Sequence, residues 1–267
     1  MATKHIEKMF NEKRYADCRN YCDWAFGDNP TLFNPDALPE DFRCMAVSTF
    51  LTGDILRAKP LLEQLLAMPQ YAGDAELRGM LDTASQAAPS RIPIICENEV
   101  ITPEIARLIT MLERLTHVFS GIQKPIRVLV PDSKEAYEQA YRNHWATGNI
   151  YAYESFMACG FGGVDIPFHW LVFKPQHISF AYPDAALEGM ISHELCHREM
   201  SDTLLYQTMI QLMPDLRKLE YNERLTDLRI MEHGLAYPLY RSRLHYGASR
   251  VVIQAAEIIG YLSKLQQ

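Results

Sequence analysis

The sequence predicts an α+β protein: a helical region over residues 1–90, then a region over residues 91–267 with a small mixed or antiparallel sheet followed by helices. Three observations lead to this prediction. Apolar residues recur every three or four positions in the first region, which is the helical period. Short alternating segments rich in branched residues follow, up to Tyr182. After Pro183 only helical periodicity remains, and strands that precede helices are typical of the α+β class.

Composition limits the kinds of partner that we expect. The chain has 267 residues, of which 48% are hydrophobic, so it can bury a sizeable core. A net charge of -7 and the absence of a Lys/Arg run predict that nucleic acid is not a partner. No segment has the roughly 18 consecutive apolar residues of a membrane span. The six cysteines form no CxxC pair, which favours free thiols and a cytoplasmic location.

The helical region contains a repeat-like pattern. The stretch 41–69, "DFRCMAVSTFLTGDILRAKPLLEQLLAMP", resembles one tetratricopeptide repeat, and residues 11–30 give a fainter match. Each helical hairpin has one apolar side that it cannot bury alone, so we expect the hairpins to stack on each other and on the following region. A tetratricopeptide-like module over residues 1–90 could bind a protein partner. An ordinary helical bundle without repeat ancestry is the alternative.

Pro89, Ser90 and Pro93 interrupt the helical pattern and place a domain boundary near residue 90. Beyond it, Thr102 followed by Pro103 predicts the start of a helix that ends near Phe119. A second helix is expected over residues 133–145, "SKEAYEQAYRNHW". The predicted strands are 92–96, the stretch "PIRVLVPDS", "HWLVFKP" (169–175) and "HISFAYP" (177–183), the last two expected to be antiparallel neighbours.

The stretch "MISHELCHREM", which begins at Met190, contains an H-E-x-x-H pattern within a predicted helix. His193 and His197 are four positions apart, so both imidazoles lie on one helix face and could bind the same zinc ion. Glu194, the next residue round the helix, could take a proton from a zinc-bound water. A solvated helix face without metal is the alternative. Cys196 lies on a different face, and we expect it to pack in the core.

A catalytic zinc ion needs a third protein ligand and an open position. In "LEYNERLTDLRIMEHG", Glu223 and Asp227 are four positions apart on a predicted helix. Glu223 could be the third ligand, and Asp227 could accept the outward N–H of a ligand histidine. Two alternatives remain open: Glu223 could be a surface carboxylate, and His233 could be the third ligand in its place.

These two segments resemble the gluzincin metallopeptidases. HELCH matches their H-E-x-x-H, and NERLTD matches the N-E-x-x-x-D of several of their families. The resemblance covers roughly residues 91–267 and implies a zincin-like domain in which an edge strand binds the substrate backbone. It implies zinc binding by His193, His197 and Glu223, with Glu194 as general base and Asp227 supporting a histidine.

Peptide hydrolysis of this type also needs a group that stabilises the oxyanion of the tetrahedral intermediate. The segment "HGLAYPLYRSRLHYG" offers five candidates. Tyr237 and His245 lead, ahead of Tyr240, Arg241 and Arg243.

Together these features predict a zinc-dependent metallopeptidase that acts on a peptide or protein substrate, with a helical N-terminal module that positions the substrate. The alternative is a catalytically latent, zincin-fold adaptor or regulator that acts through the helical module. A third hypothesis, a helical scaffold without metal, requires Glu223 to lie far from both histidines.

Overall fold

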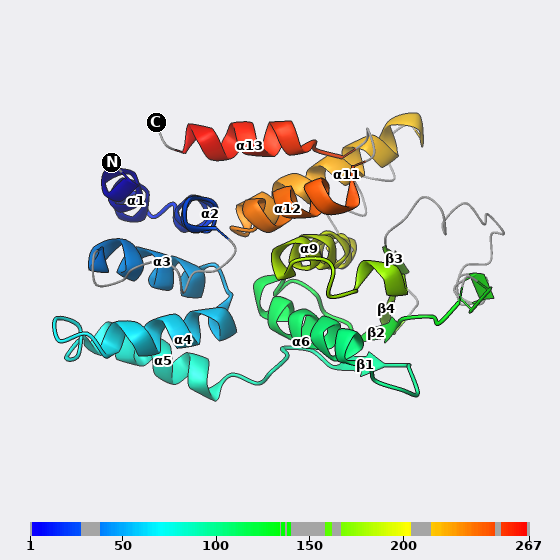
Figure 1. Cartoon of the computed structure of the whole chain (residues 1–267), viewed down its shortest axis with the longest axis horizontal. Coiled ribbons are helices and arrows are strands. Elements are labelled where there is room, and N and C mark those ends of the chain that lie inside the picture. Colours follow the sequence, from blue (N-terminus) through cyan, green and yellow to red (C-terminus); the bar gives the residue numbers. More distant parts are fainter. Residues whose placement is uncertain are drawn as a thin grey trace.

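A computed structural model of the chain describes residues 2–27, 38–133, 135–136, 138–139, 158–161, 167–203, 215–248 and 252–265. Figure 1 shows the first five helices stacked beside the rest of the molecule. They are α1 (Ala2–Asn11), α2 (Tyr15–Phe26), α3 (Pro39–Leu51), α4 (Ile55–Leu66) and α5 (Ala75–Gln86). In the described part of the first ninety residues no strand occurs, as predicted.

Local signals explain where these N-terminal helices begin and turn. Pro39 occupies the first turn of α3, where its missing N–H costs no hydrogen bond. Gly53 has a φ of 88° in the turn between α3 and α4, a conformation that L side chains rarely adopt. The carboxylate of Asp74 caps α5 by accepting from the backbone N–H groups of Glu76 and Leu77. The result is a series of helical hairpins, and their tetratricopeptide ancestry stays a prediction.

The second part contains a four-stranded sheet with the order β1-β2-β4-β3. Strands β1, β2 and β4 run parallel, and β3 pairs antiparallel with β4 at one edge. The sheet is therefore mixed, and the chain belongs to the α+β class in general terms. The strands are β1 (Ile94–Cys96), β2 (Ile126–Leu129), β3 (Ala158–Phe161) and β4 (His169–Phe173).

The predicted strand over residues 177–183 is wrong. A 3-10 helix, η2 (Pro175–His177), and turns occupy this segment instead. The guanidinium group of Arg107 donates to the carbonyl oxygens of Ser179 and Tyr182, at 3.3 and 2.8 Å. These bonds satisfy backbone groups that a strand would pair with a neighbour. The antiparallel neighbour of β4 is β3, and the predicted helix over 133–145 lies largely outside the described residues.

Five further helices belong to the described part of the fold: α6 (Pro103–Val118), α9 (Asp184–Ser201), α11 (Asp215–Glu232), α12 (Ala236–Tyr246) and α13 (Ala255–Lys264). Helix α9 (Asp184–Ser201) packs against both α12 and α6, and lies between them in Figure 1. Helix α13 packs against α2 and so brings the C-terminal part next to the N-terminal helices. Among the described residues, no helix is long and apolar enough to cross a membrane.

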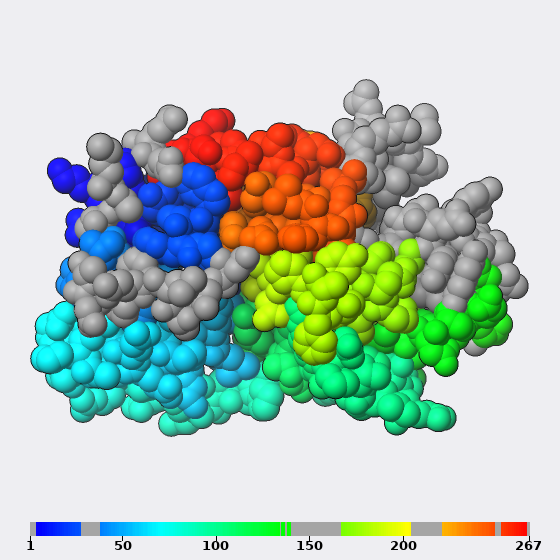
Figure 2. All heavy atoms as spheres, in the orientation of Figure 1, coloured from blue at the N-terminus to red at the C-terminus, as the bar shows by residue number. Residues whose placement is uncertain are grey.

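The two predicted regions share one hydrophobic core. A single cluster of buried side chains includes Leu62 of α4, Leu112 of α6 and Leu195 of α9. In the space-filling view of Figure 2, the N-terminal helices, blue and cyan, lie directly against the orange α12 and the green α6. The predicted boundary near residue 90 falls between α5 and β1. The helical region therefore packs as part of the molecule and buries its apolar sides against the second part.

A buried group of ion pairs also joins the two parts. Arg19 of α2, whose side chain is fully buried, places Nη2 2.6 Å from Oδ2 of Asp54, just before α4. Arg114 of α6 lies 2.8 Å from Glu188 of α9, and Arg19 lies 3.9 Å from the same Glu188. Burial alone would raise the pKa of Asp54, but Arg114 and Arg19 outweigh burial and lower it. Asp54 is therefore held as a carboxylate in the interior.

Candidate metal centre

Helix α9 brings the two histidines of HELCH onto one face. The apolar positions that predict this helix, Leu187, Ile191 and Leu195 among them, are fully buried. Their burial fixes the rotation of α9 and turns the opposite side, with His193 and His197, towards α11. The histidine side chains are 13% and 11% exposed, so water reaches them only in part.

Three side chains converge between α9 and α11. Nε2 of His193 lies 3.1 Å from Nε2 of His197 and 3.0 Å from Oε2 of Glu223. Nε2 of His197 lies 3.4 Å from Oε1 of the same carboxylate. Zinc bonds of about 2.0–2.1 Å place neighbouring ligands of a tetrahedral site roughly 3.3 Å apart, so these distances fit one zinc ion. The hypothesis that Glu223 lies far from both histidines is wrong.

The donor set itself favours a divalent cation. Two imidazole nitrogens and one carboxylate are ligand types that zinc accepts, and three protein ligands leave one position for water or substrate. Among the described residues, His193, His197 and Glu223 form the group of His, Cys, Asp or Glu side chains whose ligand atoms lie close enough together to hold one metal ion. Catalytic zinc sites use three protein ligands in this way, whereas structural zinc sites use four.

Asp227, the residue proposed as the supporting carboxylate, lies behind His193. Its Oδ1 is 3.0 Å from Nδ1 of His193 and accepts a hydrogen bond from Arg243 at 2.7 Å, and its Oδ2 accepts one from the backbone N–H of Ile253 at 2.8 Å. Asp227 is fully buried and is held from three directions. It can therefore fix both the orientation of His193 and the nitrogen that carries the proton.

Burial and the contacts within the cluster both shift the pKa values of its three residues. Burial alone would lower the pKa of His193, but hydrogen bonds to Asp227 and Glu223 raise it to about 10. Burial lowers the pKa of His197, and neighbouring His193 adds to that effect. Burial would raise the pKa of Glu223, yet the two histidines lower it well below its usual range. The side chain of Glu223 is therefore an ionised carboxylate at neutral pH.

Other predicted residues lie around this cluster. Glu194 is partly exposed and follows His193 on α9. Cys196 is fully buried, as predicted, and burial raises its pKa. His233 is not in the cluster: its Nε2 lies 2.9 Å from Oε2 of Glu199. His233 therefore does not take the place of Glu223 as the third member of the group.

The two leading oxyanion candidates both contact Arg241 on α12. Tyr237 is buried, and its hydroxyl lies 3.1 Å from Nη1 of Arg241. His245 is exposed, and its Nε2 lies 3.2 Å from Nη2 of the same arginine. Arg243, a weaker candidate, is buried against Asp227. Arg243 therefore contacts the carboxylate that lies behind His193.

Sequence reasoning missed two partners of the site. The sequence predicts Arg243 only as an oxyanion candidate and gives no role to Thr226, although its Oγ1 lies 3.1 Å from Nδ1 of His197. Thr226 follows Glu223 by three positions, so helical spacing alone places both on one face. That spacing is the signal that could have identified it.

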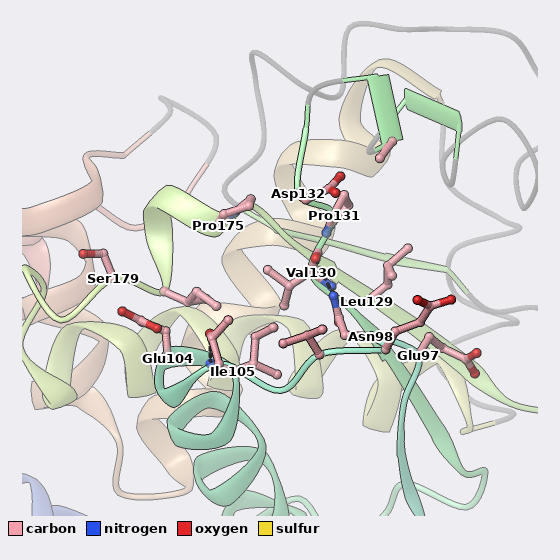
Figure 3. A pocket seen from close by; sticks show the side chains of 15 residues that line it. Glu97, Asn98, Glu104, Ile105, Leu129, Val130, Pro131, Asp132, Pro175 and Ser179 are labelled. Atoms are coloured by element: carbon pink, nitrogen blue, oxygen red, sulfur yellow. Dashed lines mark hydrogen bonds between the residues drawn. The ribbon is translucent and has the colours of Figure 1, made fainter.

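A cavity of about 550 Å³ opens at the carboxyl ends of β1 and β2, beside the start of α6. Figure 3 shows Glu97, Glu104 and Asp132 around it, with Ile105 and Val130 on its apolar side. None of its lining residues belongs to the three-residue cluster. The candidate metal centre is therefore a separate feature between α9 and α11.

Gly189 allows α12 to approach α9 closely, one turn before His193. A Cβ atom on residue 189 would overlap the carbonyl oxygen of Pro238 and lie 2.8 Å from Cβ of Ser242. Because the first contact is with backbone, relief requires the two helices to move apart. Gly189→Ala is therefore expected to lower the free energy of unfolding by about 1–3 kcal/mol, measured by urea denaturation.

Gly260→Ala is the matched control. It also lies within a helix, α13, and an added Cβ there meets no atom within 4 Å. Alanine at that position is expected to leave stability unchanged or to raise it by about 0.5–1 kcal/mol. Equal effects of the two substitutions would contradict the close approach of α9 and α12.

Comparison with known proteins finds no matching family model, no match among curated proteins and no match among solved structures.

Proposed function

We propose that the chain is a zinc-dependent metallopeptidase of the gluzincin type. The observation that carries this proposal is the convergence of His193, His197 and Glu223 within 4.8 Å of one another. The two helices that supply these residues also carry Glu194 and Asp227, in the order that HELCH and NERLTD imply. A chance H-E-x-x-H on a solvated helix would not need a carboxylate from a second helix beside both imidazoles.

The sheet supports a peptide as the substrate. Strand β3 is the antiparallel strand at the end of the sheet, and among the described strands it pairs with β4 alone. Helix α9 contacts β3, so the edge strand lies beside the helix that carries HELCH. An extended peptide could add to such an edge through backbone hydrogen bonds, which would deliver a peptide bond to the region of the cluster.

Each residue has a proposed role. His193, His197 and Glu223 would hold zinc, which polarises a carbonyl group and lowers the pKa of water towards neutrality. Glu194 would accept the proton of the attacking water and pass it to the leaving amine. Asp227 orients His193. Tyr237 and His245 remain the proposed groups for the oxyanion.

Metal removal tests the proposal directly. We expect one zinc ion per chain by elemental analysis and hydrolysis of an unfolded protein substrate, followed as release of new amino groups. A chelator should abolish hydrolysis and added zinc should restore it, because the general base acts on a water that zinc activates.

Glu223→Gln, which removes the anionic ligand, should lose both zinc and hydrolysis. The control is Glu232→Gln, at an exposed glutamate on the same helix. Absence of zinc from the wild-type protein, or hydrolysis that survives in Glu223→Gln, would contradict the proposal.

A further inference from the structure

Thr226 lies at the centre of a short chain of hydrogen bonds behind His197. Its side chain is fully buried on α11, one residue before Asp227. Oγ1 lies 3.1 Å from Nδ1 of His197 and 2.8 Å from the backbone carbonyl oxygen of Asn222. Sδ of Met200 lies further off, at 3.6 Å. Of these three neighbours, Nδ1 of His197 is the atom that can either donate or accept a hydrogen bond, whereas the other two only accept.

Counting protons decides the direction of each bond. A threonine hydroxyl has one proton to donate and lone pairs with which to accept. A carbonyl oxygen only accepts, so the 2.8 Å contact with Asn222 takes that proton. If the proton turned to Met200 instead, the outcome for His197 would be the same, since thioether sulfur is also an acceptor. Oγ1 therefore accepts from Nδ1–H of His197.

This direction determines the tautomer of His197. A neutral imidazole carries one proton, and with that proton on Nδ1 the lone pair is on Nε2. Nε2 is the nitrogen that lies 3.1 Å from His193 and 3.4 Å from Glu223. The nitrogen left free to bind a metal therefore points at the other two ligands.

One turn of α11 supplies both the candidate ligand and the hydrogen-bond partners of the two histidines. Glu223 is the ligand, Thr226 accepts from His197, and Asp227 accepts from His193. The two partners differ in charge: Asp227 is an anion that Arg243 neutralises, whereas Thr226 is neutral. Thr226 can thus orient its histidine without adding negative charge to the interior.

We propose that Thr226 is a positioning residue that holds His197 in the tautomer required to bind zinc. This inference rests on the proposed function, because it assumes that the cluster binds zinc. It concerns a residue that neither HELCH nor the N-E-x-x-x-D spacing specifies.

Zinc affinity, measured by competition with a chromophoric chelator, tests the inference in two matched pairs. Thr226→Val replaces the hydroxyl with a methyl group and should weaken zinc binding by about 10-fold or more, the range seen for lost partners of ligand histidines. Thr226→Ala and Thr226→Ser differ only in the hydroxyl. The serine variant should stay within about 2-fold of wild type and the alanine variant should match valine.

Circular dichroism of each metal-free variant verifies folding, and the alanine–serine pair decides the result if the valine variant does not fold. Equal zinc affinities in both pairs, with zinc bound by wild type, would overturn the role of Thr226 alone. Failure of wild type to bind zinc would overturn this role together with the proposed function.

Discussion

Glu194→Gln is expected to lower kcat for peptide hydrolysis by about 10²–10⁴-fold, the usual contribution of a general base. The substitution keeps the size and polarity of the side chain but removes its ability to accept a proton. Glu194 is not one of the three residues whose ligand atoms converge, so zinc should remain bound at one ion per chain. The measurement is kcat on a fluorogenic peptide, with zinc content determined on the same preparation.

Two comparisons make this result specific. Glu232→Gln changes an exposed glutamate, 65% accessible at its side chain, and should leave kcat unchanged. Glu223→Gln should lose hydrolysis and zinc together, whereas Glu194→Gln should lose hydrolysis alone. If Glu194→Gln hydrolysed peptides at the wild-type rate with zinc bound, Glu194 could not be the general base.

The largest expected effect on stability comes from Arg19→Met. Arg19 and Asp54 are both fully buried and lie 2.6 Å apart. Methionine keeps much of the apolar stem but leaves the Asp54 carboxylate without its closest cation. Breaking a buried pair in this way costs about 3–5 kcal/mol, because the remaining charge stays desolvated. The free energy of unfolding, from urea denaturation of the metal-free protein, should fall by that amount.

Arg14→Met is the matched control for Arg19→Met. Arg14 pairs with Asp17 and Glu12, but its side chain is 44% exposed, so water screens these pairs. Its loss should cost no more than about 1 kcal/mol. A loss of stability in Arg19→Met no larger than in Arg14→Met would show that the buried pairs contribute little to joining the two parts of the chain.

Much of the helical structure could be predicted because it depends on local spacing. Phe42, Met45 and Leu62 follow the helical period, and all three are buried in α3 or α4. The i, i+4 spacing of His193 and His197 likewise predicts a shared face without knowledge of the fold. The approach of Glu223 was implied by the resemblance, and no local rule could have placed α11 beside α9.

The remaining features depend on contacts between distant segments. Ile178 and Phe180 alternate as in a strand, but Arg107 binds the carbonyl groups of this segment and holds it in turns. The parallel pairing of β2 with β4 leaves no periodic signature in either strand. Arg19 in an amphipathic helix would usually face water, and its burial requires Asp54 from another helical hairpin.

Helix α9 carries Glu188 at its N-terminal half and His193 and His197 further along. Glu188 contacts Arg19 and Arg114, and the two histidines belong to the candidate metal centre. Coupling between two binding events is reciprocal. If the docking of the N-terminal helices strengthens zinc binding, zinc binding stabilises that docking by the same free energy. If zinc binds as proposed, slower proteolysis of α1–α5 is therefore the expected sign of zinc occupancy.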